Sequence, residues 1–164
     1  MKYAPFTIHG STDSPLGRII VAAHGDQLAG LWFDGQRHQP DIGGWPLQAD
    51  HPLLERAFAQ LGEYFAGRRR QFDLPLDLGC GSAFQQSVWR ALLTIAPGAT
   101  STYGALSAAI GKPRALRAVG GAIGRNPFSI VVPCHRVIGA DGSLTGYAGG
   151  LERKTRLLQL EGAL

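Results

Sequence analysis

The chain has 164 residues, of which 45% are hydrophobic and 17% are charged, a globular composition that excludes an intrinsically disordered protein and fits one domain or two small ones. The net charge of +4 favours a polyanionic partner such as a nucleic acid, although many basic proteins bind none. No apolar run approaches the roughly 18 residues of a membrane span, and the start of the chain lacks the apolar region of a secretory signal, so we expect a cytoplasmic protein with no membrane partner.

The first third of the chain predicts antiparallel strands. Three segments, near residues 4–9, 18–23 and 28–33, are rich in β-branched and aromatic side chains. Turn residues separate them, over 13–17 and 24–26. We therefore expect a small antiparallel sheet.

A long loop then leads to a helix, with Asp50 as its predicted N-cap. Apolar side chains at helical spacing share one face of this helix: Leu54, Phe58, Leu61 and Phe65. Beyond the helix, apolar and polar residues alternate over 72–78, which predicts one more strand. The sequence Gly79-Cys80-Gly81 predicts a hinge between two domains, 1–79 and 80–164.

The second half of the chain predicts helices and loops. A capping-box pattern indicates a helix over about 82–95. Two shorter helices are expected over about 103–110 and 113–124, joined by a turn at Gly111, and together they have the size of a helix-turn-helix. A last helix is expected over about 151–161.

The clearest chemical signal is the segment 130–138, an apolar strand that delivers a cysteine beside a histidine and an arginine. The thiolate is the nucleophilic form of cysteine, and a neighbouring base or positive charge increases its fraction. On a regular strand Cys134 and His135 would point to opposite sides, but Pro133 interrupts the strand, so a loop could turn both inward with a water between them. The alternative is a buried cysteine followed by a surface His135 and Arg136.

Small residues dominate the second helix of the predicted helix-turn-helix: Ala118, Gly120, Gly121 and Ala122. Such a helix has no long side chains with which to read a major groove, but it could approach a minor groove closely. Each glycine inside a helix costs about 1 kcal/mol relative to alanine, which favours a need for close approach. Tight packing against another helix is the alternative.

Four segments together resemble one protein family: Arg117–Ala122, Asn126-Pro127, Pro133–Val137 and Tyr147–Gly150. In these segments the chain is similar to the O6-alkylguanine-DNA alkyltransferases, also called methylated-DNA–protein-cysteine methyltransferases. The resemblance is strongest over about 84–161. It implies an α/β N-terminal domain of ribonuclease H-like fold, with a small antiparallel sheet plus a helix, and a mainly α C-terminal domain that contains a helix-turn-helix.

The resemblance also implies a role for each matching residue. Cys134 would accept the alkyl group as a reactive thiolate, His135 would act as a base through a water, and Glu161 would orient His135. Asn126 would brace the active-site loop, and Tyr103 would donate its phenolic proton to the departing base. These five residues form the expected catalytic set.

The same resemblance implies a DNA interface and a pocket for the damaged base. Arg117 would fill the gap that a flipped-out nucleotide leaves in the stack. The other expected DNA contacts are Tyr103, Ala118, Gly120, Gly121 and Arg136. The expected base pocket, lined partly by backbone groups, comprises Val137, Tyr147 and Ala148.

The implied function is DNA repair by direct reversal of damage, in which an alkyl group moves irreversibly from O6-alkylguanine in duplex DNA to Cys134. The base must leave the stack first, because a protein thiol cannot reach its edge inside a duplex. The product is a stable thioether, so each molecule acts once. O4-alkylthymine as a second substrate and cooperative binding along DNA stay open. We expect a monomer without a cofactor, and no zinc site, because no cysteine precedes Cys80.

Three other classes remain open. An alkyltransferase-like protein that binds the lesion without transfer typically carries Trp in place of the acceptor cysteine, whereas position 134 is Cys. A helix-turn-helix regulator would carry polar side chains that read bases, which Ala118–Gly121 lacks. A turnover cysteine hydrolase would need a pocket with donors for an oxyanion.

Overall fold

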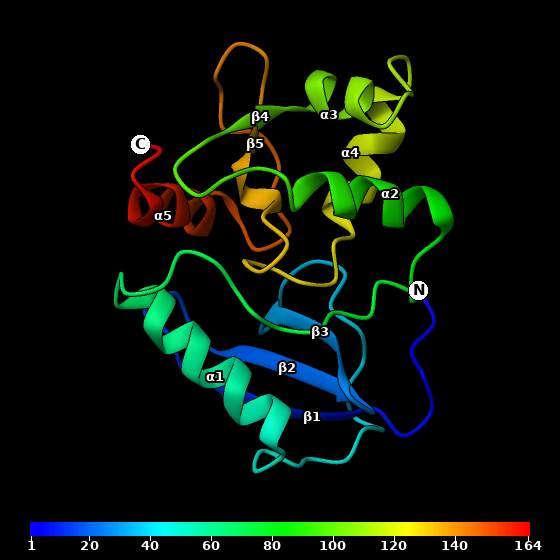
Figure 1. Ribbon diagram of the computed structural model, residues 1–164, viewed down its shortest axis with the longest axis vertical. Coiled ribbons are helices and arrows are strands. Elements are labelled where there is room, and N and C mark those ends of the chain that lie inside the picture. Colours follow the sequence, from blue (N-terminus) through cyan, green and yellow to red (C-terminus); the bar gives the residue numbers. More distant parts are fainter.

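The apolar segments near the start of the chain form one antiparallel sheet. In the computed structural model, which describes residues 1–164, β1 (Ile8–Thr12), β2 (Ile19–His24) and β3 (Gln27–Phe33) lie in the order β1-β2-β3 (Figure 1). The central strand β2 is buried from Ile19 to Ala23, because one face meets a helix and the other meets aromatic side chains. The predicted antiparallel sheet is therefore confirmed.

The first strand begins at Ile8 and not near residue 4. Phe6 adopts a left-handed φ of 63°, and the Thr7 hydroxyl donates to Ala4 O at 2.6 Å, so the chain turns before it extends. The Phe6 side chain is exposed and contributes nothing to the sheet. Apolar composition predicted the strand, but the local turn delays its start.

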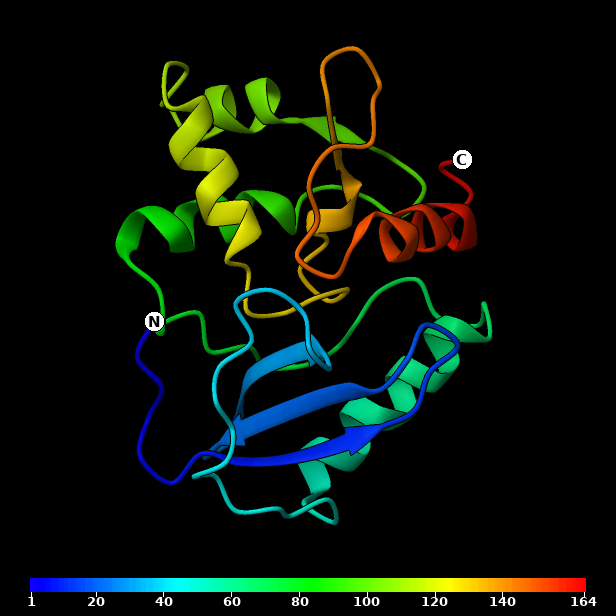
Figure 2. The same ribbon diagram turned by 180° about the vertical axis from the view of Figure 1, so that it is seen from behind.

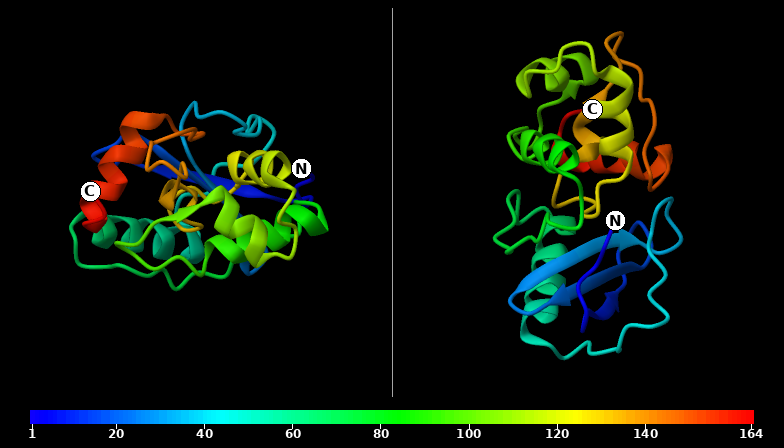
Figure 3. Two further views of the ribbon diagram at one scale, coloured as in Figure 1. Left: turned by 90° about the horizontal axis from the view of Figure 1, so that it is seen from above. Right: turned by 90° about the vertical axis from the view of Figure 1, so that its right-hand side faces the viewer.

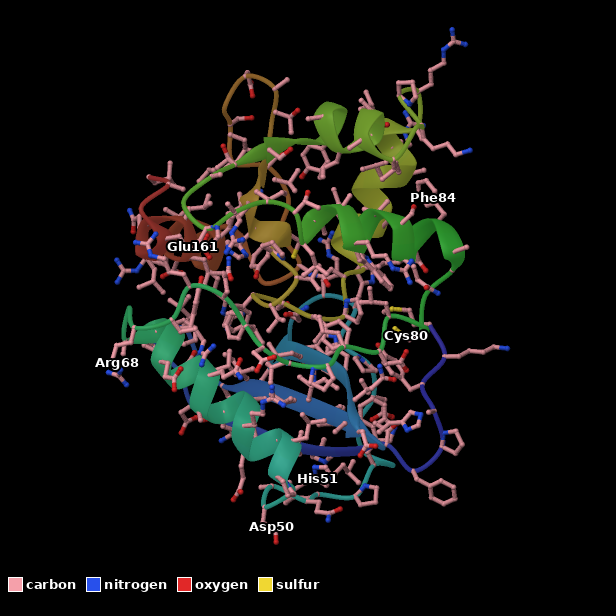
Figure 4. The ribbon with its side chains drawn as sticks, in the orientation of Figure 1. Asp50, His51, Arg68, Cys80, Phe84 and Glu161 are labelled. Carbon is pink, nitrogen blue, oxygen red and sulfur yellow. The ribbon has the colours of Figure 1, made fainter.

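Helix α1 (Pro52–Phe65) covers one face of the sheet (Figure 1). Its predicted apolar stripe faces inward, with every member buried or half-buried: Leu54, Phe58, Leu61 and Phe65. The N-cap is His51 and not Asp50, because His51 Nδ1 accepts the amide of Leu53 at 3.3 Å while Asp50 is exposed beyond the helix start (Figure 4). The proline at position 52 fits the first turn, where an amide donor is not needed.

The alternating segment 72–78 does not form the predicted strand. Only Leu76 bridges the sheet, opposite Leu28, through Leu28 N to Pro75 O at 2.8 Å and Asp77 N to Leu28 O at 2.9 Å. Pro75 has no amide proton to extend a ladder. The segment is an extended link between the two halves of the chain.

The second half of the chain is mainly helical, as predicted. It contains α2 (Ala83–Leu92), α3 (Tyr103–Ala109), α4 (Leu116–Gly124) and α5 (Leu151–Glu161) (Figure 2). Helices α3 and α4 are the pair predicted as a helix-turn-helix, and α5 has its predicted bounds. No helix is both long and apolar enough to cross a membrane.

The starts of two helices show what local sequence can and cannot predict. The capping box at α2 is confirmed, because Ser82 Oγ accepts from Gln85 N at 3.2 Å and Gln85 Oε1 accepts from Ser82 N at 2.9 Å. Helix α4, however, begins at Leu116, later than expected, because Pro113 lies in a turn that continues to Ala115. A proline suits either a first helical turn or a preceding turn.

The predicted strand over 130–138 is irregular for most of its length. Ile130 has a left-handed φ of 71°, and Cys134–Arg136 form a single 3-10 turn, η1. Only β5 (Val137–Ile138) is extended, and it pairs in parallel with β4 (Ser101–Thr102). The cysteine is therefore presented by a tight turn that interrupts the strand.

The two halves of the chain share one continuous hydrophobic core. Strand β3 pairs with the segment before the 3-10 turn, through Leu31 N to Pro127 O and Ser129 N to Leu31 O, both at 2.8 Å. Phe128 between them is fully buried. Figure 3 shows the helical half stacked on the sheet half, and apolar side chains from both halves form this core.

Candidate active site

The 3-10 turn buries both residues of the Cys-His pair. Cys134 is 5% exposed and His135 is fully buried. The turn starts at Pro133 and is closed by hydrogen bonds from Arg136 N to Pro133 O at 3.0 Å and from Val137 N to Cys134 O. The prediction that this loop turns both side chains inward is confirmed, and the alternative of a surface His135 is wrong.

Asn126 connects the acceptor sulfur to the turn that carries it. Its Nδ2 donates to Cys134 Sγ at 3.1 Å and to Val132 O at 2.8 Å, while its Oδ1 accepts from Phe128 N at 2.9 Å. Asn126 is itself buried. One amide thus holds the loop from both ends and presents a donor to sulfur, which stabilises a thiolate when one forms.

The resting state of Cys134 differs from the sequence-based expectation of a reactive anion. Burial raises the pKa of the thiol to about 11, although Asn126 and the ammonium of Lys154 act in the opposite direction. Desolvation penalises the charged form of any buried acid. Burial therefore favours the protonated thiol in the free protein, so that formation of the thiolate calls for a base.

His135, which follows Cys134 in the same turn, has the hydrogen-bond pattern and the charge state of a base. Its Nε2 lies 2.9 Å from Glu161 Oε1, which assigns the proton of a neutral ring to Nε2. Burial lowers the pKa of His135 despite the opposing effect of Glu161, so the ring is neutral at physiological pH. Its buried Nδ1 has no hydrogen-bond partner and can accept a proton.

Glu161, at the end of α5, is a buried carboxylate surrounded by donors (Figure 4). Arg136 donates from Nε to Oε2 at 2.8 Å and from Nη2 to Oε1 at 2.9 Å, and Tyr64 donates to Oε1 at 2.7 Å. Burial alone would raise the pKa of Glu161, but the hydrogen bonds from His135, Arg136 and Tyr64 hold it well below its ordinary value. Glu161 is thus ionised and fixed.

The structure corrects the expectation that Arg136 contacts DNA. Arg136 is only 6% exposed, and its Nη1 donates to Ile95 O at 2.5 Å while its other donors bind Glu161. A guanidinium engaged in this way has no free fork for a phosphate. Arg136 belongs to the support of the carboxylate.

A surface pocket of about 350 Å³ reaches Cys134. Besides Cys134 on the 3-10 turn, three parts of the chain line it: the loop after β3, the α3–α4 pair, and the loop before α5 with the first residue of that helix. Together with Cys134, the lining includes Arg37, His38, Tyr103, Gly120, Tyr147 and Ala148. Val137 does not line the pocket, because its side chain is fully buried and its carbonyl accepts from Lys154 Nζ at 2.5 Å, so this part of the expected base pocket is not found.

Four of the expected DNA-contacting residues lie on the second helix of the pair, α4: Arg117, Ala118, Gly120 and Gly121. Arg117 and Ala118 are exposed, and Gly120 and Gly121 are partly exposed, whereas Val119 is buried against the core. Tyr103 begins α3, lines the pocket and places its hydroxyl 3.4 Å from Thr145 O. The small residues therefore make an open face beside the pocket mouth.

Sequence reasoning missed the contribution of the loop after β3. Arg37 and His38 line the pocket, and Arg37 N donates to Ala148 O at 3.1 Å, which links this loop to the pocket wall (Figure 2). His38 has a left-handed φ of 65°. No motif marks these residues, since they lie far in sequence from the others and only the fold brings them near.

The structure also contains no group of three or more His, Cys, Asp or Glu side chains arranged to hold a metal ion. The second cysteine, Cys80, lies half-buried in the link between the halves, near the N-terminus (Figure 4). It takes no part in the pocket.

Comparison with known proteins adds independent findings. The model of the 6-O-methylguanine DNA methyltransferase ribonuclease-like domain matches residues 7–78, and that of the DNA-binding domain of the same family matches residues 83–163. The methylated-DNA–protein-cysteine methyltransferase of Mycobacterium leprae is 50% identical over 151 residues, covering 92% of this chain and 90% of the relative. The corresponding protein of Haemophilus influenzae is 43% identical over 149 residues, covering 90% and 82%.

Among solved structures, the Mycobacterium tuberculosis protein titled OGT in complex with DNA superimposes with a TM-score of 0.87. It is 47% identical, and the match covers 94% of this chain and 92% of that one. The structure titled O6-methylguanine methyltransferase from the same organism has the same TM-score and identity, with coverage of 96% and 93%. These similarities span both halves, which confirms the ribonuclease-like and DNA-binding fold classes.

Proposed function

Because the chain belongs to the 6-O-methylguanine DNA methyltransferase family, we propose that it repairs alkylated DNA by transferring the alkyl group from guanine O6 to Sγ of Cys134. The observation that carries this assignment is the position of Cys134. Its sulfur lies at a pocket that opens beside α4, within reach of an amide donor and next to a neutral histidine. A DNA base everted from the duplex could enter such a pocket.

The transfer is a displacement at an sp3 carbon. The thiol proton passes to Nδ1 of His135 through a water, and a sulfur lone pair forms the new S–C bond as the C–O6 bond breaks. The electron pair of that bond moves into the guanine ring, which takes a proton from the Tyr103 hydroxyl. The Tyr103 phenolate then takes a proton from the His135 imidazolium through water, so the proton lost by sulfur balances the one gained by the base.

The residues around Cys134 divide this work. Glu161 accepts from Nε2 of His135, which stabilises the imidazolium that forms when Nδ1 takes the proton. Asn126 and the cation of Lys154 favour the thiolate. Because burial disfavours a thiolate and an imidazolium in the empty site, deprotonation of Cys134 and attack on the alkyl carbon are expected to be coupled. The thiol then stays unreactive until an alkylated DNA base occupies the pocket.

The DNA interface follows from the face of α4. We assign Arg117 to the gap left in the stack, and Ala118, Gly120 and Gly121 to close approach in the minor groove. Tyr103, Tyr147 and Ala148 line the pocket for the everted base. A Cβ at Gly120 would lie 3.8 Å from the ring of Tyr103, in ordinary van der Waals contact, so this glycine forms part of the wall beside that ring.

We also assign the organisation of the protein. The N-terminal half, 1–79, supplies the sheet that supports the active-site turn, and the C-terminal half, 80–164, supplies the acceptor and the DNA face. One copy contains every group named above, which supports action as a monomer, and the location that we propose is the cytoplasm. Its partner is double-stranded DNA that carries alkylated bases, and copies bound to neighbouring sites could cooperate.

The test is intact-protein mass spectrometry after mixing with duplex DNA that carries one O6-methylguanine. The expected result is the gain of one methyl group per protein, mapped to Cys134. Cys134→Ala should gain none but still bind the duplex, while Cys80→Ala is the matched control and should react normally. Binding without a mass change would indicate a lesion-binding protein, and several demethylated bases per protein would indicate a hydrolase.

A further inference from the structure

A tyrosine from the N-terminal half enters the catalytic hydrogen-bond network. Tyr64 lies near the end of α1, is 2% exposed, and donates its hydroxyl proton to Glu161 Oε1 at 2.7 Å. Figure 1 shows the end of α1 facing α5, the helix that ends at Glu161. This hydrogen bond joins two residues 97 positions apart.

The oxygen that Tyr64 binds is the one that His135 uses. Oε1 of Glu161 accepts from Tyr64, from His135 Nε2 at 2.9 Å and from Arg136 Nη2 at 2.9 Å, whereas Oε2 accepts from Arg136 Nε alone among the side chains. A carboxylate oxygen has two lone pairs, so three donors on one oxygen compete for them. The strength of the bond to His135 therefore depends on the other two.

We propose that Tyr64 is a positioning residue for the transfer: its hydroxyl fixes Oε1 of Glu161 and, by sharing that oxygen, limits how strongly the carboxylate holds a proton on His135. The N-terminal half thereby tunes the catalytic base. This inference rests on the proposed alkyl transfer, in which His135 must be neutral before it accepts the thiol proton.

The effect of removing the hydroxyl has a defined sign. In Tyr64→Phe the carboxylate keeps its charge but has one donor fewer, so it binds the imidazolium more strongly and the pKa of His135 rises. The other charged groups that face His135 are Arg136 on its own turn and Lys154 on α5, and both lower the pKa of His135 and stay in place. The tyrosine itself remains a neutral donor, because burial and Glu161 raise its pKa well above the ordinary value.

The variant is expected to fold. Phenylalanine keeps the ring contacts of Tyr64, which packs edge-on to Phe65 at 5.3 Å and tilted to Phe72 at 5.4 Å. Tyr3→Phe is the matched control. It removes one hydroxyl from a tyrosine that packs on Trp45 at the opposite side of the sheet, away from the pocket.

The experiment measures the single-turnover rate of methyl transfer from O6-methylguanine duplex DNA between about pH 5 and pH 8. We expect the acid limb of Tyr64→Phe to move to higher pH by roughly half to one unit, the size of the change when one hydrogen bond to a charged group is redistributed. Histidine ring signals in NMR should show the same upward shift in the pKa of His135. Tyr3→Phe should leave both unchanged.

Three results would overturn the inference: an unshifted acid limb, a rate that falls equally at every pH, or a shift of the same size in Tyr3→Phe. Failure of the proposed function is distinguishable, because the unmodified protein would then transfer no methyl group at any pH.

Discussion

Replacing Arg136 tests whether this residue supports Glu161 or contacts DNA. Arg136→Met keeps most of the apolar stem but removes the guanidinium, and with it two hydrogen bonds to Glu161 and one to Ile95 O. Each hydrogen bond to a charged group contributes about 1.5–3 kcal/mol, and breaking a buried ion pair on one side costs about 3–5 kcal/mol because the other charge stays buried. Tyr64 and His135 still bind Glu161, which places the expected loss at the lower end, about 3 kcal/mol.

The assay is urea unfolding followed by tryptophan fluorescence, compared with binding of undamaged duplex DNA at several salt concentrations. We expect a lower free energy of unfolding but an unchanged slope of log affinity against log salt. Arg117→Ala is the matched control, since Arg117 is exposed on α4. Its stability should change by less than about 0.5 kcal/mol, and its salt slope should fall by about one. If Arg136→Met instead kept its stability and lost salt dependence, the buried role would be refuted.

Three further predictions concern the site. Asn126→Asp should slow transfer strongly, because a carboxylate in place of the amide, which now lies 3.1 Å from the sulfur, would repel the thiolate. Single-turnover rates would test this, with Asn126→Gln as the comparison. Equal rates for the wild type and Asn126→Asp would count against the role of the amide. Cys134 in the free protein should react slowly with iodoacetamide at neutral pH and faster as the pH approaches its pKa of about 11, followed by mass spectrometry; rapid labelling near pH 7 would mean that the thiolate is already present. The depressed pKa of Glu161 contributes stability that is present above its unfolded pKa of about 4.3 and is lost as the pH falls toward its folded pKa. In urea unfolding, Glu161→Gln should therefore lack this acid-dependent loss of stability. An identical pH dependence in both proteins would contradict the assignment.

Elements defined by local chemistry could be predicted from sequence. The capping box at Ser82 and the last helix, 151–161, were both found where expected, because hydrogen bonds and apolar spacing within a few residues determine them. The segment 72–78 alternates like a strand, yet it has only one neighbour to pair with and a proline that cannot donate. Alternation shows that one side is buried, but it cannot show that a partner strand exists.

Site residues that belong to a sequence motif were predicted, whereas residues that only the fold brings to the site were missed. Asn126 and His135 were identified through resemblance, and the structure places both in contact with the expected partners. Arg136 was expected among the DNA contacts through the same resemblance, whereas its guanidinium binds the carboxylate of Glu161, 25 positions later. Tyr64 and Arg37 come from the other half of the chain, and no local pattern distinguishes them from ordinary helix and loop residues.

The backbone pairing of Leu31 with the segment around Phe128 has a consequence for the integrity of the molecule. Protease cleavage at the exposed Gly79, in the link between the two halves, would leave two fragments. Each fragment has an apolar surface that is covered by the other fragment in the intact fold. A nicked molecule should therefore migrate as a single species in size-exclusion chromatography until denaturant separates the pieces. Neither fragment, expressed by itself, should stay in solution as readily as the intact chain.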